Sequence, residues 1–280
     1  MGAILFAGWL MAATVLPDTI IELRHGDTVV FSEVSGEIVV ETWDRSELSV
    51  VGEGGDPRDL VVVREGARVN VQPGERKGRS VEVDVLIRVP AWAGLDIRGR
   101  RLDVAVSGTT ADVRVRNVTG DIRVSETSGR LVLNSADGQV EVLDARGSVT
   151  VTSRGDDVTL RGVRGTVDVR SGSGNVVLED VESSSVRAET LDGDLTFSGS
   201  LARGGTYAFS VHDGDASIAI PESPGVLVRV ATFDGEFTSD FPVVLEGYGG
   251  GGQFEFTIGD GSARMEIKVF DGEMRLLRRR

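Results

Sequence analysis

The sequence predicts an all-β fold: a single-domain parallel β-solenoid with about 18 residues in each coil and two strands per coil. Three observations support this prediction. Pairs of apolar residues recur every nine residues, polar residues alternate with them, and alternate nine-residue units resemble each other more than adjacent ones do. Repetition at a fixed short period is typical of stacked architectures, in which each unit contacts only its neighbours.

The nine-residue period runs without interruption through the middle of the chain, apart from one extra residue in the serine run Glu182–Ser185. Apolar residues that alternate with polar ones predict short strands with one buried face. Valine and threonine dominate and glycine ends each unit, which favours strands over helices. The apolar pairs are Leu95/Ile97, Val104/Val106, Val113/Val115, Ile122/Val124, Leu131/Leu133, Val140/Val142, Val149/Val151, Val158/Leu160, Val167/Val169, Val176/Leu178, Val186/Ala188 and Leu195/Phe197.

A second period of eighteen residues predicts how the strands pair. Serine recurs before one class of turn and a small aliphatic residue before the other, so the repeating unit has two strands and two turns. Equivalent strands of successive units would then pair in parallel, about 4.8 Å apart. Right-handed winding follows from the crossover rule, and an antiparallel meander is the alternative. The recurring residues are Ser135, Ser153 and Ser171, and Ala145, Val163 and Val181.

The N-terminus predicts export. Ala3–Leu16 is apolar and uncharged, shorter than the roughly 20 residues of a membrane-spanning helix but typical of the apolar core of a secretory signal. No basic residue precedes it and the cleavage pattern is poor, so a buried first strand is the alternative. We expect residues 1–17 to be a signal peptide or apolar leader, and the protein to lie in the periplasm, in the cell envelope or outside the cell.

Residues 18–280 form the predicted solenoid domain. We divide it into a less regular first region (18–94), a regular core (95–198) and C-terminal coils (199–280). The last region holds seven of the ten phenylalanines, which we expect to close the core in wider coils.

Composition excludes some functions. The formal charge of −14 argues against nucleic acid as a partner, because phosphate binding requires a basic face. The chain has no cysteine, which excludes disulfides, thiol catalysis and thiolate metal sites.

Several longer phrases carry a family resemblance. The chain opens with "SGEIVVETWDRSEL" (Ser35–Leu48), continues with repeats of the type "GDIRV", and closes with "TLDGDLTFSG", "HDGDASIAIPE", "TFDGEFTSDFP" and "GDGSARMEIKVFDGEMRL". In this order, over most of residues 25–277, the sequence resembles the bacterial putative-adhesin family of unknown function. The resemblance implies a solenoid and an envelope or extracellular location, and it assigns no catalytic residue.

Aspartate–glycine turns are the candidate metal sites. Stacked turn carboxylates could hold calcium, which takes six to eight oxygen ligands. The calcium-binding repeat G-G-x-G-x-D does not occur in tandem, and Asp-Gly is also what a tight turn prefers. We expect no cofactor, with calcium at these turns as the alternative. The turns are Asp137-Gly138, Asp192-Gly193-Asp194, Asp213-Gly214-Asp215, Asp234-Gly235, Asp260-Gly261 and Asp271-Gly272.

Catalysis is not predicted. The outward positions change charge along the predicted stack, as in a solvated face, whereas glycosidases require paired carboxylates. His25 and His212 lie far apart in sequence, and no G-x-S-x-G motif accompanies either. We therefore assign no catalytic, cofactor-binding or metal residue. The outward rows are Asp121, Gln139, Asp157, Asn175 and Arg123, Glu141, Thr159, Val177.

Other polar and aromatic residues allow two interpretations each. The three recurring serines could contact sugars or satisfy turn backbone groups, and the second is favoured. Trp43, Trp92 and Tyr248 could stack on a ligand or close a solenoid end. The basic end Arg275–Arg280 could touch anionic lipid or a partner, or form a free tail.

The sequence therefore predicts a non-catalytic structural or binding (adhesin-like) module of the bacterial cell envelope or exterior. Its partner would be a cell-surface glycan or an envelope protein, with no nucleic acid and no membrane span. The alternatives are a scaffold that self-associates through its solenoid ends, and a carbohydrate-active β-helix enzyme.

Overall fold

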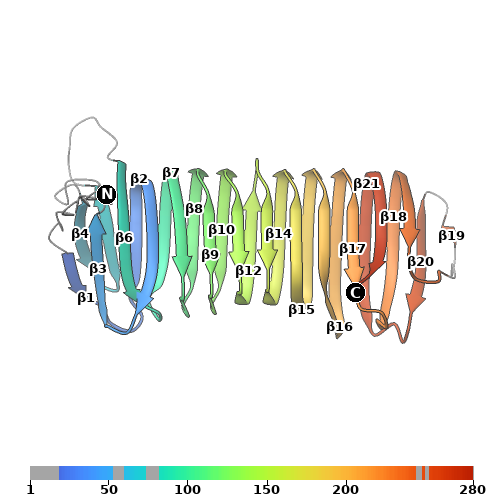
Figure 1. Cartoon of the computed structure of the whole chain (residues 1–280), viewed down its shortest axis with the longest axis horizontal. Helices are drawn as coiled ribbons and strands as arrows, with labels where there is room; N and C mark the ends of the chain where they lie inside the picture. The colour runs from blue at the N-terminus through green and yellow to red at the C-terminus, as the bar shows by residue number, and fades with distance from the viewer. Residues whose placement is uncertain (1–18, 53–59, 74–81, 244–247, 250–251, 280) are drawn as a thin grey trace, which may run out of the picture.

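The fold is all-β. A computed structural model describes residues 19–52, 60–73, 82–243, 248–249 and 252–279, which contain 21 β-strands and no helix (Figure 1). Residues 1–17, where the sequence predicts a leader, lie outside this described part. Within the described ranges, no helix long and apolar enough to cross a membrane is found.

The strands in the middle of the chain alternate between two series. Each strand pairs in parallel with the next member of its own series at an offset of eighteen residues, as in Leu131↔Val149 and Val140↔Val158. This is the register that the sequence predicts. The first series contains β8 (Val113–Thr119), β10 (Leu131–Asp137), β12 (Arg146–Ser153) and β14 (Arg164–Ser173). The second contains β9 (Ile122–Ser125), β11 (Val140–Leu143) and β13 (Val158–Arg161).

Two longer strands contribute to both series. β15 (Val176–Asp192) and β16 (Leu195–Asp213) begin in the second series and continue into the first. The register between β14 and β15 shifts where Arg164 pairs with Glu182 but Val167 pairs with Val186. The extra residue of the serine run therefore forms a local bulge that leaves the stack intact.

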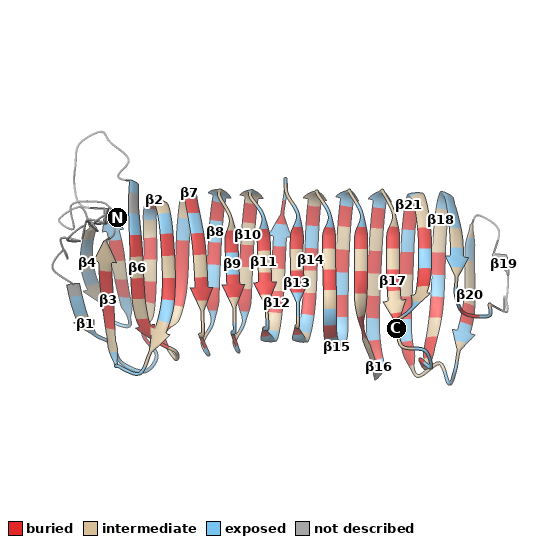
Figure 2. Cartoon of the chain, viewed as in Figure 1, coloured by how far each residue is buried: buried red, intermediate tan, exposed pale blue. Residues whose placement is uncertain are grey.

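The core lies between the two series. All twelve predicted apolar pairs are buried, and the residues between them face outward, so that bands of burial and exposure alternate along each strand (Figure 2). Two rows of turns bound the core. Edge one leads from the first series to the second, at residues 117–121, 135–139, 153–157 and 171–175. Edge two leads back, at residues 126–130, 144–148, 162–166 and 180–185.

The N-terminal end departs from a purely parallel stack. β2 lies between β7 and the pair β5 and β6, parallel to all three. β4 is antiparallel to β5, and β3 is antiparallel to β6 and β1. The bounds are β1 (Thr19–Glu22), β2 (Thr28–Trp43), β3 (Glu47–Gly52), β4 (Leu60–Glu65), β5 (Arg68–Pro73), β6 (Glu82–Pro90) and β7 (Gly94–Ser107).

The expectation of parallel strands throughout residues 18–280 is thus wrong at this end, where the sheet is mixed. The physical reason is loop length. Only two residues, Gly66 and Ala67, join β4 to β5, and so short a connection can join only antiparallel neighbours.

The C-terminal end is also rearranged. β21 lies between β16 and β18 and is parallel to both, while β20 is antiparallel to the outer edge of β18. The last strand in sequence is therefore inserted into the stack. Its far half also pairs with β17. The bounds are β17 (Ala216–Ile220), β18 (Val226–Ser239), β19 (Tyr248–Gly249), β20 (Gln253–Ile258) and β21 (Ala263–Arg278).

This insertion contradicts the free tail, one of the two interpretations of the basic end, and leaves contact with lipid or a partner untested. Residues 275–278 belong to β21, and the Arg279 N–H donates to the carbonyl of Ile220 at 2.7 Å. Residues 275–279 are not a free tail, because their backbone pairs with neighbouring strands. Arg280 lies outside the described residues.

The phenylalanines of the last region divide between core and surface. Phe209 and Phe256 are buried, as expected for residues that close the core. Phe233 and Phe270, by contrast, are 78% and 47% exposed. They occupy outward positions of the strand alternation, since Thr232 and Val269 beside them belong to the inward row. The expectation that this region's phenylalanines fill the core is wrong for these two.

Candidate functional site

A polar groove follows edge two. It has a volume of about 590 Å³ and runs across several stacked turns. Its lining consists of charged residues and of small ones (threonine, serine and glycine), unlike the aliphatic interior. The lining residues are Glu126, Thr127, Ser128, Asp144, Arg146, Gly162, Arg164, Asp180, Glu182 and Arg279.

A repeated backbone turn builds the groove. Glu126, Asp144 and Asp180 have φ near +50°, and Gly162, which takes the same place in another coil, has φ of +67°. Non-glycine residues seldom adopt this left-handed region, and they cluster at functional sites when they do. The residue that follows is buried, as at Ala145. The turn therefore exposes a carboxylate on the surface immediately before it seals the core.

Backbone hydrogen bonds between coils hold these turns in place. The Asp144 N–H donates to Arg161 O at 2.9 Å, and the Arg146 N–H donates to Thr127 O at 2.7 Å. The turn that carries Asp144 and Arg146 is thus anchored to the coils on both sides. The groove is carried by a rigid scaffold, which suits a site that must present side chains at fixed spacing.

The charges in the groove are of both signs. Arg164 Nε lies 3.2 Å from Glu182 Oε2, and Arg279 pairs with Asp180. Arg146 is exposed beside them. Guanidinium groups donate in a planar fork and carboxylates accept. The groove therefore offers donors and acceptors side by side, repeated at about the strand spacing of 4.8 Å.

The sequence prediction did not identify this groove. Its signal was present, because positions 126, 144, 162 and 180 are eighteen apart and the last three immediately precede the small aliphatic row Ala145, Val163 and Val181. An acidic residue or a glycine at such a position is typical of a left-handed turn, so the pattern alone does not indicate a binding site.

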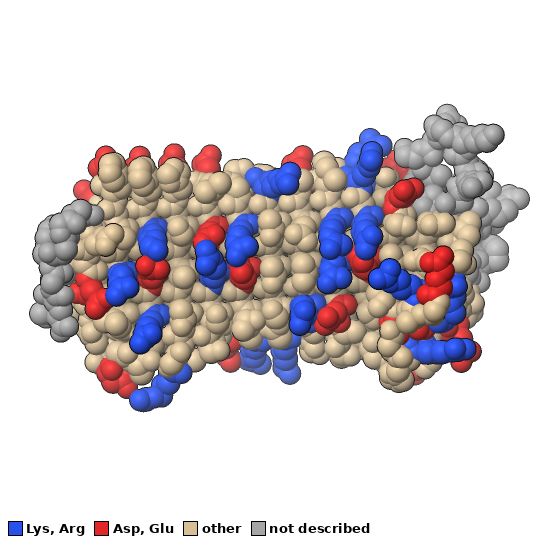
Figure 3. All heavy atoms as spheres, turned by 180° about the vertical axis from the view of Figure 1, so that it is seen from behind, with Lys and Arg blue, Asp and Glu red and all other residues tan. Residues whose placement is uncertain are grey.

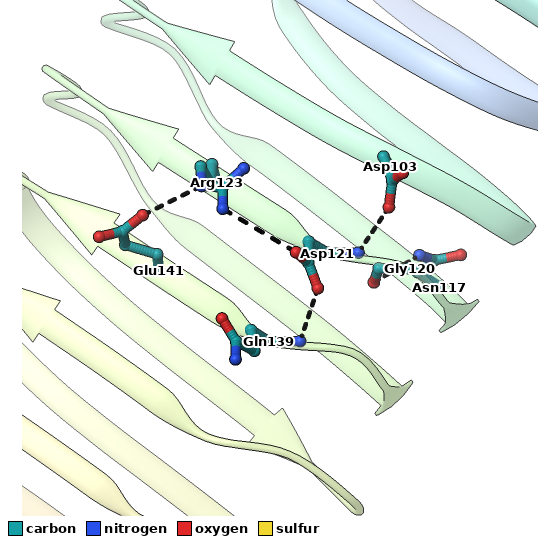
Figure 4. Close-up of polar contacts among 7 residues, drawn as sticks. All are labelled: Asp103, Asn117, Gly120, Asp121, Arg123, Gln139 and Glu141. Carbon is teal, nitrogen blue, oxygen red and sulfur yellow. Dashed lines mark hydrogen bonds and ion pairs between the residues drawn. The ribbon is translucent and has the colours of Figure 1, made fainter.

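Edge one carries a different polar feature, a ladder of aspartate and asparagine side chains. Asp103 Oδ1 accepts the Asp121 N–H at 2.8 Å, and Asp121 Oδ1 accepts the Gln139 N–H at 3.0 Å (Figure 4). Each short side chain thereby ties its coil to the neighbouring one. Equivalent bonds join Asp84 to Glu37 (3.2 Å), Asp157 to Asn175 (2.7 Å), Asn175 to Asp194 (3.0 Å), Asp194 to Asp215 (2.9 Å) and Asp215 to Glu273 (2.9 Å).

The direction of the side-chain hydrogen bonds changes at Gln139. Its side chain is one methylene longer, and here the coils are joined in the other direction: Asp156 Oδ2 accepts the Gly138 N–H at 2.6 Å. These bonds give a structural role to Asp121, Asp157 and Asn175, which the sequence analysis placed on a solvated face.

The Asp-Gly turns show the tight-turn role favoured from the sequence. Asp194 and Asp215 belong to the ladder, and the Ser262 N–H donates to Asp260 Oδ1 at 3.1 Å. Hydrogen bonding from Ser262 lowers the pKa of the Asp260 carboxyl. In the described part of the chain, no group of three or more histidine, aspartate or glutamate residues could hold a metal ion. Calcium binding at these turns stays an untested alternative.

The role of a ladder side chain can be tested by removing its acceptor oxygen in one variant and keeping it in another. We expect Asp157→Ala to cost about 1 kcal/mol, since the Asn175 N–H would lose its partner. Asp157→Asn should cost much less, because the amide oxygen can accept the same bond, as it does at Asn175. Urea unfolding of both variants measures the difference, and equal losses would contradict the assigned role.

The outward rows of the second series are bridged by ion pairs. Arg123 Nε lies 3.1 Å from Glu141 Oε2, and Arg161 Nε lies 2.7 Å from Glu179 Oε2. Figure 3 views the opposite face, which carries the first series, and there too acidic and basic side chains are interspersed, with acidic groups projecting along one edge. Exposed pairs of this kind contribute little to stability, and no concentrated carboxylate pair is formed by these residues.

The recurring serines have the turn role favoured from the sequence. Ser135, Ser153 and Ser171 are buried, and each hydroxyl donates to a carbonyl of its own turn. The alternative of sugar contact is wrong for these residues, since a ligand cannot reach them.

The histidines and aromatic candidates are dispersed. His25 stacks on Trp92 near the N-terminal end, with ring centroids 4.2 Å apart, whereas His212 stacks on Phe270 in the C-terminal part. Trp92 packs partly buried against the core, and Trp43 Nε1 donates to Glu47 O at 2.8 Å. The side chain of Tyr248 lies outside the described residues. The structure thus does not bring the histidines together.

Comparisons with known proteins give a family and several similar solved structures. No curated protein matches the chain. Similar solved structures include a putative adhesin from Bacteroides fragilis, 14% identical over 93% of this chain and 96% of the other, with a TM-score of 0.45. A putative adhesin from Parabacteroides merdae is 9% identical over 93% and 95%, with a TM-score of 0.41. A putative lipid binding protein from Parabacteroides distasonis is 15% identical over 92% and 95%, with a TM-score of 0.39.

At these scores, the structural likenesses carry no argument about function. The family model described as Toastrack DUF4097 matches residues 27–276, which span the strands from β2 into β21 and agree with the resemblance seen in the sequence. The chain therefore belongs to the Toastrack DUF4097 family.

Proposed function

We propose that this chain is a non-catalytic, adhesin-like binding module of the bacterial cell envelope or exterior. Its ligand is an extended, hydroxyl-rich polymer such as a cell-surface glycan, which lies along the groove of edge two. One observation carries the proposal: the groove repeats charged donors and acceptors on turns that neighbouring coils hold rigid.

The repeat geometry supports this choice of ligand. A right-handed, two-faced β-solenoid of 18-residue coils would present the same turn once per coil, and the parallel registers of the middle strands are those such a coil requires. A polymer with its own repeat can then make many similar contacts at once. Weak contacts made simultaneously raise the overall affinity without requiring a deep pocket.

Charge also favours hydroxyls over phosphates. Glu126, Asp144, Asp180 and Glu182 offset the groove arginines, and the chain as a whole carries −14. An anionic polymer would therefore be repelled by the protein as a whole. Neutral sugars both donate and accept, which matches a groove lined by arginine and carboxylate groups.

Sedimentation with bacterial envelope fragments tests the proposal. Fluorescently labelled protein should pellet with fragments treated with proteinase, but not with fragments whose vicinal diols have been cleaved by periodate. Arg146→Glu and Arg164→Glu should each weaken binding at least tenfold, because both side chains line the groove. Arg114→Glu is the matched control, an exposed arginine outside the groove.

Three results would overturn the proposal. Binding that survives both groove substitutions would remove the groove as the site. Binding abolished by proteinase would point to an envelope protein as the partner. Release of reducing sugar from the fragments would make the chain an enzyme.

A further inference from the structure

A row of exposed apolar and aromatic side chains crosses the C-terminal part of the first series. Leu191, His212, Phe270 and Phe233 take the same place in neighbouring strands, β15, β16, β21 and β18. The ring centroids of His212 and Phe270 are 4.7 Å apart, and those of Phe270 and Phe233 are 4.8 Å apart with the planes inclined by only 2°. We call these four residues the aromatic row.

The aromatic row is not part of the core. Phe233 is 78% exposed, Leu191 is 64% exposed and Phe270 is 47% exposed. Stacking between two rings is a weak stabilising contact, which does not account for three large apolar side chains left in water. In the regular coils the same row holds Val118, Ala136, Arg154 and Gly172, so large apolar side chains are neighbours only at the C-terminal end. Contiguous exposed apolar surface of this kind marks an interaction site.

A hollow of about 550 Å³ lies beside the row. The small residues Ser210 and Ala231 line it, two residues before His212 and Phe233 on the same strands. Glu189, Lys268 and Gln253 also line it and supply a carboxylate, an ammonium group and an amide. An aromatic wall with a few polar groups beside it is the usual composition of a small-ligand site.

We propose that the aromatic row is a saccharide-binding site. A sugar ring has an apolar face of C–H groups and an equatorial belt of hydroxyls. The free face of Phe233, at the end of the stack, would take the apolar face as the next member of the stack. The hydroxyls would then reach Lys268 and Gln253, which donate, and Glu189, which accepts.

The site is independent of the proposed groove. The aromatic row lies on the first series next to edge one, whereas the groove follows edge two. A saccharide is favoured over an anionic lipid surface, because the chain carries −14 and Glu189 lies in the hollow. Strand pairing on both sides of Phe270 fixes the row before binding, so little ordering is needed.

The two histidines provide a built-in probe. The chain has His212 in the row and His25 at the opposite end, stacked on Trp92. NMR of the two imidazole Cε1–H signals should follow titration with chitohexaose, cellohexaose, maltohexaose and xylohexaose. We expect a saturable shift of His212 with at least one of these sugars, and no shift of His25.

Matched substitutions locate the effect. Phe233→Ala should weaken the sugar affinity at least tenfold, since Phe233 provides the free ring face and is separated from His212 by Phe270. Val118→Ala is the control, because Val118 is 50% exposed and takes the same place in β8, far from the hollow. Arg146→Glu in the groove should leave the His212 titration unchanged, which separates this site from the proposed function.

Each contrary result would overturn the inference. If none of the four sugars shifts the His212 signal, the aromatic row is not a saccharide-binding site. A His212 shift that depends on protein concentration alone would assign the row to a second copy of the chain. A shift seen only with vesicles of phosphatidylethanolamine and phosphatidylglycerol would assign it to a membrane surface.

Discussion

Replacing Val149 with aspartate is expected to destabilise the protein by several kcal/mol. Val149 is 1% exposed and lies between Leu131 and Val167 of the neighbouring coils. An aspartate there would place a carboxylate among aliphatic side chains with no partner for its charge. Either the charge is buried or the coil opens, and both reduce the free energy of unfolding.

Urea unfolding measures the effect, with Thr150→Asp as the control one residue away. Thr150 faces outward, so its substitution should cost less than about 1 kcal/mol. Its register partner on the next coil is Asp168, and repulsion between the two carboxylates should account for most of that loss and weaken in salt. Equal effects at the two positions would mean that the inward and outward assignment is wrong.

The same alternation explains why the middle of the fold could be predicted. In the coils before the serine run, most members of the apolar pairs lie beside residues eighteen positions before and after them, and these are again valine, leucine or isoleucine. Leu131 pairs with Val113 and Val149 in this way. The period of the sequence therefore predicts both where the strands lie and which strands pair.

The ends could not be predicted because the period there no longer specifies which strands pair. The alternation in β21 indicates a strand, but it does not specify neighbours that lie 58 residues before it in β16 and 37 residues before it in β18. Insertion of β21 depends on which edges remain open once the other strands have formed. An open edge would recruit other chains, and β20 covers part of the edge of β18.

The two candidate surfaces escaped prediction for different reasons. The groove residues, such as Asp144, follow the eighteen-residue period, but the sequence does not reveal that their turns leave a hollow. Phe233 and Phe270 were assigned to the core because phenylalanine is usually buried. Their position in the alternation, next to the inward Thr232 and Val269, would have placed them on the surface.

Replacing Gly138 with alanine is expected to destabilise edge one strongly. Gly138 has φ of +132°, a conformation that side chains rarely adopt, and a Cβ there would lie 2.2 Å from the carbonyl oxygen of Gly120. The backbone strain alone costs about 1–3 kcal/mol. The contact adds to it, because the atom that must move is backbone of the neighbouring coil and is itself held by strand pairing.

Gly204→Ala separates the two contributions. Gly204 also has a positive φ, of +73°, but a Cβ there would meet nothing within 4 Å. It should therefore cost only about 1–2 kcal/mol, the strain of the left-handed conformation, and Gly138→Ala should cost clearly more in urea unfolding. If the two variants lose equal stability, the close approach of successive coils at edge one does not constrain the sequence. The glycines that recur at this edge would then be explained by turn conformation alone. Successive coils could in that case move apart enough to accept a Cβ without loss of stability.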